Sequence, residues 1–537
     1  MLIMPWGSGG DSRKSEAVSF SYRAVRRFYR FLTNIWFREI NVVDDENLPR
    51  EGGVLYITWH PSGLIDPMLM VATLPGELTT VAKHTLFNIP VLGRMLKASG
   101  CVPIERPQDS KDAEASRARN AITLDGLAQR LAEGGQTLIF PEGVSHTGAD
   151  IRRVRSGAAR MLLGAHLKAA EQGLPPPHLI PIGLHYSESQ TFRERAAVVV
   201  ERAMNVPPVP ERVEDAEEQD RQDRDWVAAV TQDIEVELQR ANLSKTTWNE
   251  RTMIWKGRSL AYAEKQRLGG EKLVRETYAE SVLGARRLRA GWEYYAVHRP
   301  DDTRELADQC RQHFAELDRR NITPYDVDAK PDKLTAWGYT QSFAKWLWAL
   351  VWMFGLVTWS AIAGNYVPYK ANGALSKLMK RVNIEPSVIG TIKVLSAVVF
   401  FPLWWAAGSL FMTWSLLNAS SPVNATLQMH WLTDYITQLP AAVLFVVFMC
   451  WWPLSAKLHL KLYARLLRSS RELKRWALWS DEETDWEILV ATQRNLAARL
   501  VDGGANLVLP GDPDWEDPPA GQDDVTSVRL RSNSATL

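Results

Sequence analysis

Apolar positions along the chain follow patterns that predict different kinds of secondary structure. Short apolar runs bounded by polar or turn residues predict β-strands at 54–58, 137–140, 179–184 and 196–200. Helical stretches separate several of these runs, at 111–133 and 155–172. Strands that alternate with helices predict an α/β fold, in which helices cover a sheet, and we place this domain at 40–205.

The residues before this domain predict an amphipathic helix over 16–38. Apolar side chains recur every three or four positions from Val18 to Trp36, and arginines crowd the same segment. A basic helix with an aromatic face suits the headgroup layer of a membrane, so we expect 1–39 to associate with the bilayer. The alternative is a helix that packs on its own domain.

A charged helical arm is predicted at 206–340, with helices at 224–242, 249–297 and 301–320. We find no pattern of catalytic residues in it. Towards the end of the chain, 476–501 is predicted to be helical. Residues 502–537 are rich in Gly, Pro, Asp and Ser and predict a disordered tail.

A membrane region is predicted at 341–475, where three long uncharged runs lie at 346–369, 394–433 and 435–456. Each holds about 20 or more mostly apolar residues, the length that spans a bilayer core. Lysines and arginines flank the last two runs, but the link between them has none, so they predict a transmembrane hairpin at 394–418 and 437–456 with its tip outside.

Charge and cysteine content bear on which side of the membrane the α/β domain occupies. The N-terminus lacks the basic start and apolar core of a secretory signal, and the three cysteines form neither a disulfide framework nor a metal motif. We therefore expect a cytoplasmic domain, with 346–369 as a re-entrant or interfacial segment in which Gly364 and Pro368 could break the helix. A true span with the domain outside is the alternative. A net charge of +1 predicts no general affinity for nucleic acid.

Candidate chemistry begins in ITWHPSGLIDP, where the first predicted strand ends and His60 and Asp66 follow on a turn. An imidazole can remove the proton of a hydroxyl near neutral pH. A carboxylate on its other ring nitrogen fixes the tautomer and stabilises the imidazolium. The spacing allows the two side chains to meet, although a histidine at a strand end can also serve structure alone.

Two further segments supply polar groups at the expected mouth of the sheet. Lys83 and Arg106 belong to a cationic stretch at 82–107, and the planar fork of arginine suits phosphate. In TLIFPEGVSHT a strand runs into Glu142 and Gly143, where a carboxylate can bind acceptor hydroxyls or orient a cationic group. LIPIGL, at 179–184, carries no catalytic group and predicts a core strand.

In this order, HPSGLIDP, GCVPIER, FPEG and LIPIGL resemble the motifs of the glycerolipid acyltransferase superfamily, over about residues 35–205. With its C-terminal membrane region, the chain looks most like the branch of glycerol-3-phosphate and dihydroxyacetone-phosphate acyltransferases. The resemblance implies an integral membrane O-acyltransferase of phospholipid biosynthesis. It would transfer a fatty acyl group from acyl-CoA or acyl-carrier protein to glycerol-3-phosphate or a related acceptor, without a cofactor or a metal.

The resemblance also implies a role for each matching residue. His60 would be the general base and Asp66 its partner. The acceptor and its phosphate would be held by Lys83, Arg106, Glu142, Gly143 and Arg155. Pro181 would shape the acyl pocket.

Two departures from the superfamily pattern bear on the acceptor. Five residues separate His60 from Asp66, where most members have four but the branch named above has five. His146 and its neighbours follow Gly143 where Thr-Arg is common, so the phosphate contact of that arginine must come from elsewhere. Three alternatives therefore stay open: an acyltransferase that acts on lysophosphatidate or another lysolipid, a non-enzymatic lipid-binding scaffold, and a metal-dependent hydrolase built on His60, Asp66, Glu142 and His146.

Overall fold

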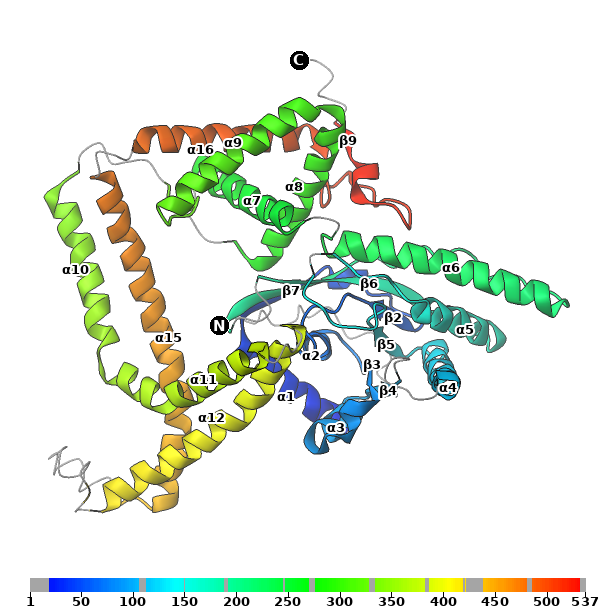
Figure 1. Cartoon of the computed structure of the whole chain (residues 1–537), viewed down its shortest axis with the longest axis horizontal. Coiled ribbons are helices and arrows are strands. Elements are labelled where there is room, and N and C mark those ends of the chain that lie inside the picture. The colour runs from blue at the N-terminus through cyan, green and yellow to red at the C-terminus, as the bar shows by residue number, and fades with distance from the viewer. Residues whose placement is uncertain are drawn as a thin grey trace. The chain divides into compact units, whose positions relative to one another are not determined.

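The computed structural model describes residues 19–105, 113–148, 150–187, 192–244, 247–269, 276–327, 334–381, 386–418, 421, 438–480 and 485–531 (Figure 1). Contacts along the chain divide it into two compact units. The first comprises Met1–Glu316, Pro386–Gly390 and Arg494–Leu537, and the second comprises Leu317–Glu385 and Thr391–Gln493.

A seven-stranded mixed sheet lies at the centre of the first unit, in the order β1-β7-β6-β2-β5-β3-β4. Its strands are β1 (Phe37–Val43), β2 (Val54–Ile57), β3 (Leu78–Lys83), β4 (Val102–Ile104), β5 (Gln136–Ile139), β6 (His178–Tyr186) and β7 (Glu194–Val200). From β6 to β4 all neighbours are parallel, whereas β7 runs antiparallel to β6 and parallel to β1. The carboxyl ends of five strands therefore meet at one edge.

The four predicted strands are confirmed, as β2, β5, β6 and β7. All four residues of β2 are completely buried, since parallel strands inside a sheet are covered on both faces. The helices of this part are α1 (Phe20–Trp36), α2 (Ile65–Thr73), α3 (Pro90–Ala98), α4 (Ala113–Ala132) and α5 (Gly157–Glu171), with 3-10 turns η1 (Asp45–Asn47) and η2 (His84–Asn88). Helices α4 and α5 correspond to the predicted 111–133 and 155–172.

Helix α1 packs on its own domain, as the alternative for 16–38 expected. Tyr22 and Tyr29 are buried, and the Tyr22 hydroxyl accepts a hydrogen bond of 2.8 Å from the backbone N–H of Leu78. The guanidinium of Arg26 donates from Nε to the carbonyl of Val71 at 2.9 Å. Phe20 is still 81% exposed, so contact of the outer face with a bilayer stays a prediction.

The charged arm is helical, but the predicted helix at 249–297 is two helices. The arm contains α6 (Ala216–Ala241), α7 (Trp248–Leu268), α8 (Tyr278–His298) and α9 (Pro300–Arg319). Helices α7 and α8 each begin with a capping box, Thr247 with Glu250 and Thr277 with Glu280. Reciprocal bonds of this kind satisfy free N–H groups at a helix start, which favours a new helix at Tyr278.

The prediction of a disordered tail is wrong for residues 502–531. Helix α16 (Trp486–Ala505) is followed by β8 (Leu507–Val508), η4 (Asp524–Ser527) and β9 (Arg529–Leu530), and β8 pairs with β9. Leu507, Leu509 and Val528 form a buried cluster with Ala290 of α8. Arg286 of α8 donates to both carboxylate oxygens of Asp524, at 2.7 and 2.9 Å. Apolar anchors and ion pairs to a distant helix order this polar segment.

The second unit contains the membrane candidates: α10 (Ala336–Met353), α11 (Leu356–Arg381), most of α12 (Pro386–Leu417) and α15 (Ala441–Trp479). Among the described residues, Ile389–Leu417 and Ala441–Trp479 are long and apolar enough to cross a membrane. Together α10 and α11 also qualify, with a bend of 52°. The predicted spans 394–418 and 437–456 fall in α12 and α15, while most of their link lies outside the described residues.

The break in the first apolar run lies at Phe354 and Gly355, not at Gly364 or Pro368 as the sequence suggested. Helix α11 continues through both of those residues. A Cβ at Gly364 would lie 2.5 Å from the Trp452 ring, so this glycine serves close packing. A bent pair fits either a broken span or a re-entrant segment, and both interpretations remain predictions.

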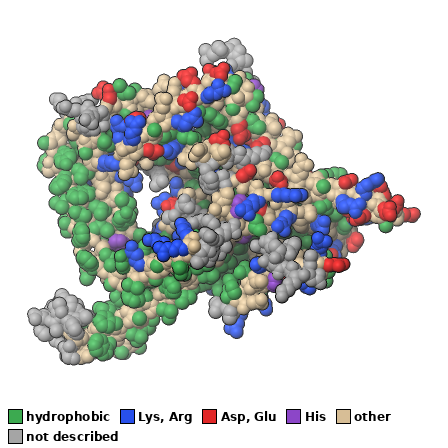
Figure 2. Space-filling view, viewed as in Figure 1, with side chains coloured by type: hydrophobic (Ala, Val, Ile, Leu, Met, Phe, Trp, Pro, Cys, Tyr) green, Lys and Arg blue, Asp and Glu red, His purple; other side chains and the backbone are tan. Residues whose placement is uncertain are grey.

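Large apolar side chains are exposed along the helices of the second unit. Figure 2 shows hydrophobic side chains gathered over α10 and α12. They include Trp348, Val351, Phe354, Leu403, Leu410, Phe411 and Trp414, each more than half exposed. Apolar surface of this extent is typical of helices that face lipid.

Candidate active site

His60 and Asp66 meet just beyond the carboxyl end of β2. The chain turns at Gly63, whose φ is +58°, and α2 then starts at Ile65 with Asp66 in its first turn. Nδ1 of His60 lies 2.7 Å from Oδ2 of Asp66. Because the Nδ1–H donates to the carboxylate, the neutral ring keeps its free lone pair on Nε2. The His60 side chain is 16% exposed, so its ring lies at the edge of the buried interior.

The Asp66 carboxylate is completely buried, and further donors compensate its charge. The backbone N–H of Ser62 donates to Oδ2 at 2.8 Å, and the Tyr186 hydroxyl donates to Oδ1 at 2.7 Å. Burial and the Asp66 charge raise the pKa of Tyr186 well above its ordinary value, so its hydroxyl stays protonated as a donor. Hydrogen bonds to both oxygens hold the carboxylate in one orientation.

Three contacts fix the position of His60 besides the bond to Asp66. Its imidazole stacks on the ring of Phe140, with centroids 4.1 Å apart and 20° between the planes. Its backbone carbonyl accepts from the N–H of His146 at 3.0 Å, and its N–H donates to Oε1 of Glu142 at 3.1 Å. The general-base candidate is therefore held through both its ring and its main chain.

Glu142 and His146 form a second, fully buried pair next to the first. Nε2 of His146 bonds Oε2 of Glu142, and Nδ1 of His146 accepts from the N–H of Gly148 at 3.1 Å. This places the His146 proton on Nε2, from which it is donated to the carboxylate. Oε2 of Glu142 also accepts from the N–H of Arg152 at 2.8 Å.

These contacts show which groups surround the Glu142 carboxylate. The sequence suggested a carboxylate that binds the acceptor or orients a cation. Its side chain is 0% exposed, and its oxygens accept from the backbone of His60 and Arg152 and from the ring of His146. The carboxylate therefore links the turn after β5 to the turn that carries His60, and its predicted part in binding the acceptor stays a prediction.

Gly143 and Arg155, both predicted for the acceptor phosphate, lie against each other. Gly143 has a φ of +70°, a conformation that glycine adopts at little cost. A Cβ at this position would lie 3.2 Å from Nε of Arg155. The backbone N–H of Arg155 donates to the carbonyl of Pro141 at 2.9 Å. The absence of a side chain at Gly143 thus makes room for the guanidinium of Arg155.

The remaining predicted residues lie farther from His60 or outside the described residues. Lys83 ends β3, which β5 separates from β2, so its backbone is about 10 Å from that strand at the usual strand spacing. Pro181 pairs in register with Ile57 of β2, three residues before His60. Arg106 lies outside the described residues, just beyond β4.

The four residues of the metal-hydrolase alternative form two separate pairs, His60 with Asp66 and His146 with Glu142. In the part of the chain that the structure describes, no group of three or more His, Cys, Asp or Glu side chains is arranged to hold a metal ion. Each imidazole faces one carboxylate, and the pairs do not converge on a common point.

Sequence reasoning did not identify Tyr186 and Phe140, and it mentioned His146 only as a metal ligand. Tyr186 ends β6, a parallel neighbour of β2, so its place at a carboxyl strand end was an available signal. Phe140 and His146 flank the Pro141–Gly143 turn. Nothing in their spacing indicates a stacked ring or a buried pair.

Comparisons with known proteins find similarity to acyltransferases. A family model described as Acyltransferase matches residues 39–185. A 1-acyl-sn-glycerol-3-phosphate acyltransferase of Borreliella burgdorferi is 27% identical over 132 residues, which are 24% of this chain and 49% of that protein. A chloroplastic protein of the same name from Arabidopsis thaliana is 24% identical over 141 residues, 25% of this chain and 37% of that protein.

The chain thus spans about half, or less, of the length of these curated relatives. The crystal structure of the 1-acyl-sn-glycerophosphate acyltransferase PlsC from Thermotoga maritima aligns with a TM-score of 0.26 and 14% identity, over 39% of this chain and 78% of that one. Residues 39–185 therefore match the acyltransferase family, and the relatives similar to this part of the chain are named 1-acyl-sn-glycerol-3-phosphate acyltransferases.

Proposed function

We propose that this protein transfers a fatty acyl group from a thioester to the hydroxyl of a phosphate-bearing glycerolipid, with His60 as the general base. The contact of 2.7 Å between Nδ1 of His60 and Oδ2 of Asp66 carries the proposal, because it leaves Nε2 free to accept a proton. The donor is acyl-CoA or acyl-carrier protein, and the reaction needs no cofactor.

In this mechanism Nε2 of His60 removes the proton of the acceptor hydroxyl as its oxygen attacks the thioester carbonyl. The buried Asp66 carboxylate stabilises the imidazolium that forms. The tetrahedral intermediate then collapses, the carbon–sulfur bond breaks, and the imidazolium returns its proton to the departing thiolate. The products are an ester and a thiol.

Lysophosphatidate is the acceptor that the relatives support. The motif spacing led us to expect glycerol-3-phosphate, but the curated relatives are named for 1-acylglycerol-3-phosphate. Both acceptors carry a phosphate, for which Arg155, Lys83 and Arg106 are the proposed ligands. A lysolipid would reach the site from the bilayer, and the candidate membrane helices support a location there, with the catalytic domain proposed to lie on the cytoplasmic face.

The test uses the full-length protein in detergent or bilayer discs, with labelled acyl-CoA and acyl-carrier protein as donors. Lysophosphatidate, glycerol-3-phosphate and dihydroxyacetone phosphate are compared as acceptors. We expect transfer to lysophosphatidate. Transfer to glycerol-3-phosphate alone would overturn the acceptor assignment, and lipid binding without any transfer would favour the scaffold.

The mechanism is tested by His60→Ala and Asp66→Asn. Loss of a general base lowers turnover by about 10²- to 10⁴-fold, and we expect this for His60→Ala, together with a loss of stability of about 1–3 kcal/mol because the buried Asp66 carboxylate loses a donor. Loss of the charged carboxylate lowers kcat by up to about 10⁴-fold in the Ser-His-Asp triad, and we expect Asp66→Asn to lower turnover in the same way. His298→Ala, at an exposed histidine of α8, is the control and should keep full activity. Equal turnover by His60→Ala and wild type would exclude His60 as the base.

A further inference from the structure

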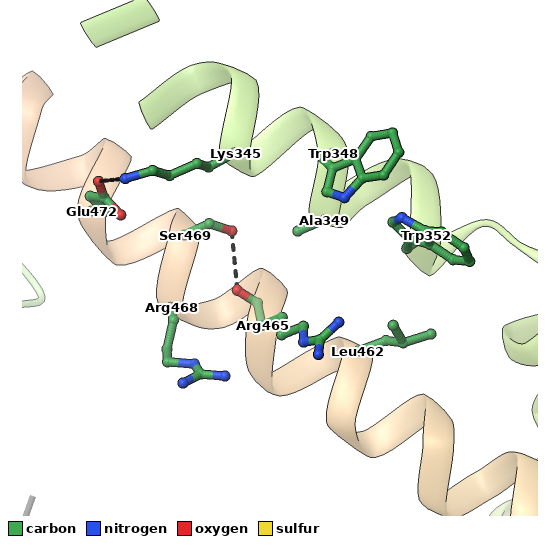
Figure 3. Close-up of a pocket in the computed structure, with 9 residues that line it drawn as sticks. All are labelled: Lys345, Trp348, Ala349, Trp352, Leu462, Arg465, Arg468, Ser469 and Glu472. Carbon is green, nitrogen blue, oxygen red and sulfur yellow. Dashed lines mark hydrogen bonds and ion pairs between the residues drawn. The ribbon is translucent and has the colours of Figure 1, made fainter. Parts of the chain in front are cut away.

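A groove of about 270 Å³ runs between α10 and α15 in the second unit (Figure 3). From α10 it is lined by Lys345, Trp348 and Trp352, which are spaced three and four residues apart and so share one helix face. From α15 it is lined by residues with the same spacing, Arg465, Arg468 and Glu472. Cationic and aromatic side chains thus border one space.

The charges around the groove are not balanced by the protein. Glu472 is already bonded, since Nζ of Lys345 and Oγ of Ser342 both donate to its Oε1, at 2.9 and 3.1 Å. Within the described part of the chain, neither Arg465 nor Arg468 forms an ion pair with a carboxylate. Arg468 donates only to the carbonyl of Ala464 in its own helix, at 3.3 Å. Two guanidinium groups therefore remain for an oxyanion.

The walls of the groove are apolar as well as cationic. Trp348 and Trp352 are 65% and 52% exposed, and their rings lie edge to face with centroids 5.9 Å apart. The short side chain of Ala349 lies between them and the arginines. A free phosphate ion gains nothing from contact with exposed indole rings. An amphiphile with a phosphate head and hydrocarbon chains can contact both the cationic and the aromatic surface of the groove.

The position of the groove along α15 suits the headgroup layer. The helix is uncharged from Ala441 to Ala456, and lysines and arginines follow. At 1.5 Å per residue, a hydrocarbon core of about 30 Å that begins at Ala441 ends near Leu460. Arg465 and Arg468 then lie just beyond the hydrocarbon, at the depth of lipid phosphates.

We propose that this groove binds the phosphate headgroup of an anionic phospholipid. Arg465 and Arg468 contact the phosphate, and Trp348, Trp352 and Leu462 lie along the glycerol and upper acyl chains. Basic pockets between membrane helices recognise acidic headgroups in this way. The site is separate from His60 and does not depend on the acyl-transfer proposal.

The test measures lipid binding to the delipidated full-length protein in detergent by native mass spectrometry. The probes are phosphatidylglycerol, phosphatidylcholine and inorganic phosphate. We expect Arg465→Gln with Arg468→Gln to weaken phosphatidylglycerol binding by about 30-fold, the loss expected for two arginine contacts near an anionic surface. The control is Lys461→Gln with Arg471→Gln, which removes the same charge from exposed positions of α15 that do not line the groove.

A second variant tests the space itself without changing any charge. Ala349→Phe fills the groove and should weaken phosphatidylglycerol binding while leaving its two arginines in place. Equal losses in the control pair, or wild-type binding by Ala349→Phe, would overturn the proposal. So would equal binding of phosphatidylcholine, or inorganic phosphate that displaces the lipid at matched concentration. None of these readouts involves turnover, so they stand apart from the test of His60.

Discussion

Tyr186 donates a hydrogen bond of 2.7 Å to Oδ1 of Asp66, while His60 contacts the other oxygen of the same carboxylate. The tyrosine ends β6, and the aspartate lies 120 residues earlier in the chain, in the first turn of α2. His60, Asp66 and Tyr186 therefore form one hydrogen-bonded group, contributed by the turn after β2, by α2 and by β6. The bond between Tyr186 and Asp66 depends on the register of β6 beside β2, because that register places the tyrosine near the carboxylate.

Tyr186→Phe should lower both stability and turnover. The change removes one donor from a buried carboxylate, which costs about 1–3 kcal/mol, and it loosens the group that orients His60. Thermal unfolding and initial rates of acyl transfer check the prediction. Tyr262→Phe, which removes a hydroxyl bonded to Gln266 on α7, is the control for a generic loss. Unchanged stability and rate in Tyr186→Phe would show that the bond has no role.

His146→Ala should destabilise the fold, because it leaves the buried Glu142 carboxylate without a side-chain donor. Breaking a buried pair from one side typically costs about 3–5 kcal/mol. Turnover should also fall, since the backbone of His60 is held by both residues. His146→Gln can still donate to the carboxylate and should recover part of both losses. Equal effects of Ala and Gln would argue against the hydrogen bond.

Gly143→Ala should raise the KM for the phosphate-bearing acceptor more than it lowers kcat. An alanine in the left-handed region costs about 1–2 kcal/mol, and its Cβ would press on the guanidinium of Arg155. Gly126→Ala, in α4 with open space around the added methyl, is the matched control and should be neutral or stabilising. A lower kcat with an unchanged KM in Gly143→Ala would argue that Arg155 does not bind the acceptor.

Stability should fall as the pH drops below about 6.5, in part through His185. Burial, with the positive charge of Arg251 nearby, lowers the pKa of His185 to about 3. Between that value and its ordinary pKa of about 6.5, the unfolded chain binds a proton that the folded chain does not. The contribution of His185 is therefore complete above pH 6.5 and declines by about 1.4 kcal/mol per pH unit down to about pH 3.

His185→Gln cannot titrate and should show a flatter decline between about pH 6 and 4. Unfolding measured across this range for both proteins gives the difference. Burial also lowers the pKa of His166, but that histidine is present in both proteins and its contribution cancels. Parallel pH profiles would mean that the His185 site opens to water before the protein unfolds.

The sequence predicted the parts of the site that depend on neighbours in the chain. His60 and Asp66 share one turn, so their spacing was enough to predict contact. The strands around them are continuous apolar runs. Tyr186 escaped notice because its contact depends on strand order. The contacts of Glu142 were not predicted, because its partners include backbone N–H groups, which no motif reveals.

The same limit explains the errors in the second half of the chain. Residues 502–531 are polar by composition, and only the fold brings Asp524 to Arg286. Gly364 and Pro368 were expected to break a helix, yet α11 continues through both residues. The ring of Trp452 packs against Gly364, where a side chain would not fit. In both cases a partner far away in the sequence decides the local structure.

Arg286 also donates a hydrogen bond of 3.1 Å to Glu201, which lies just past the end of β7. Arg286 therefore joins Asp524, near the end of the described residues, to the end of this strand. A premature stop codon after Ala505 would leave this guanidinium with one carboxylate and would uncover Ala290. Proteolytic trimming at the C-terminus would therefore weaken the packing of α8, the helix that contacts the end of β7, although the cut lies more than 300 residues from that strand.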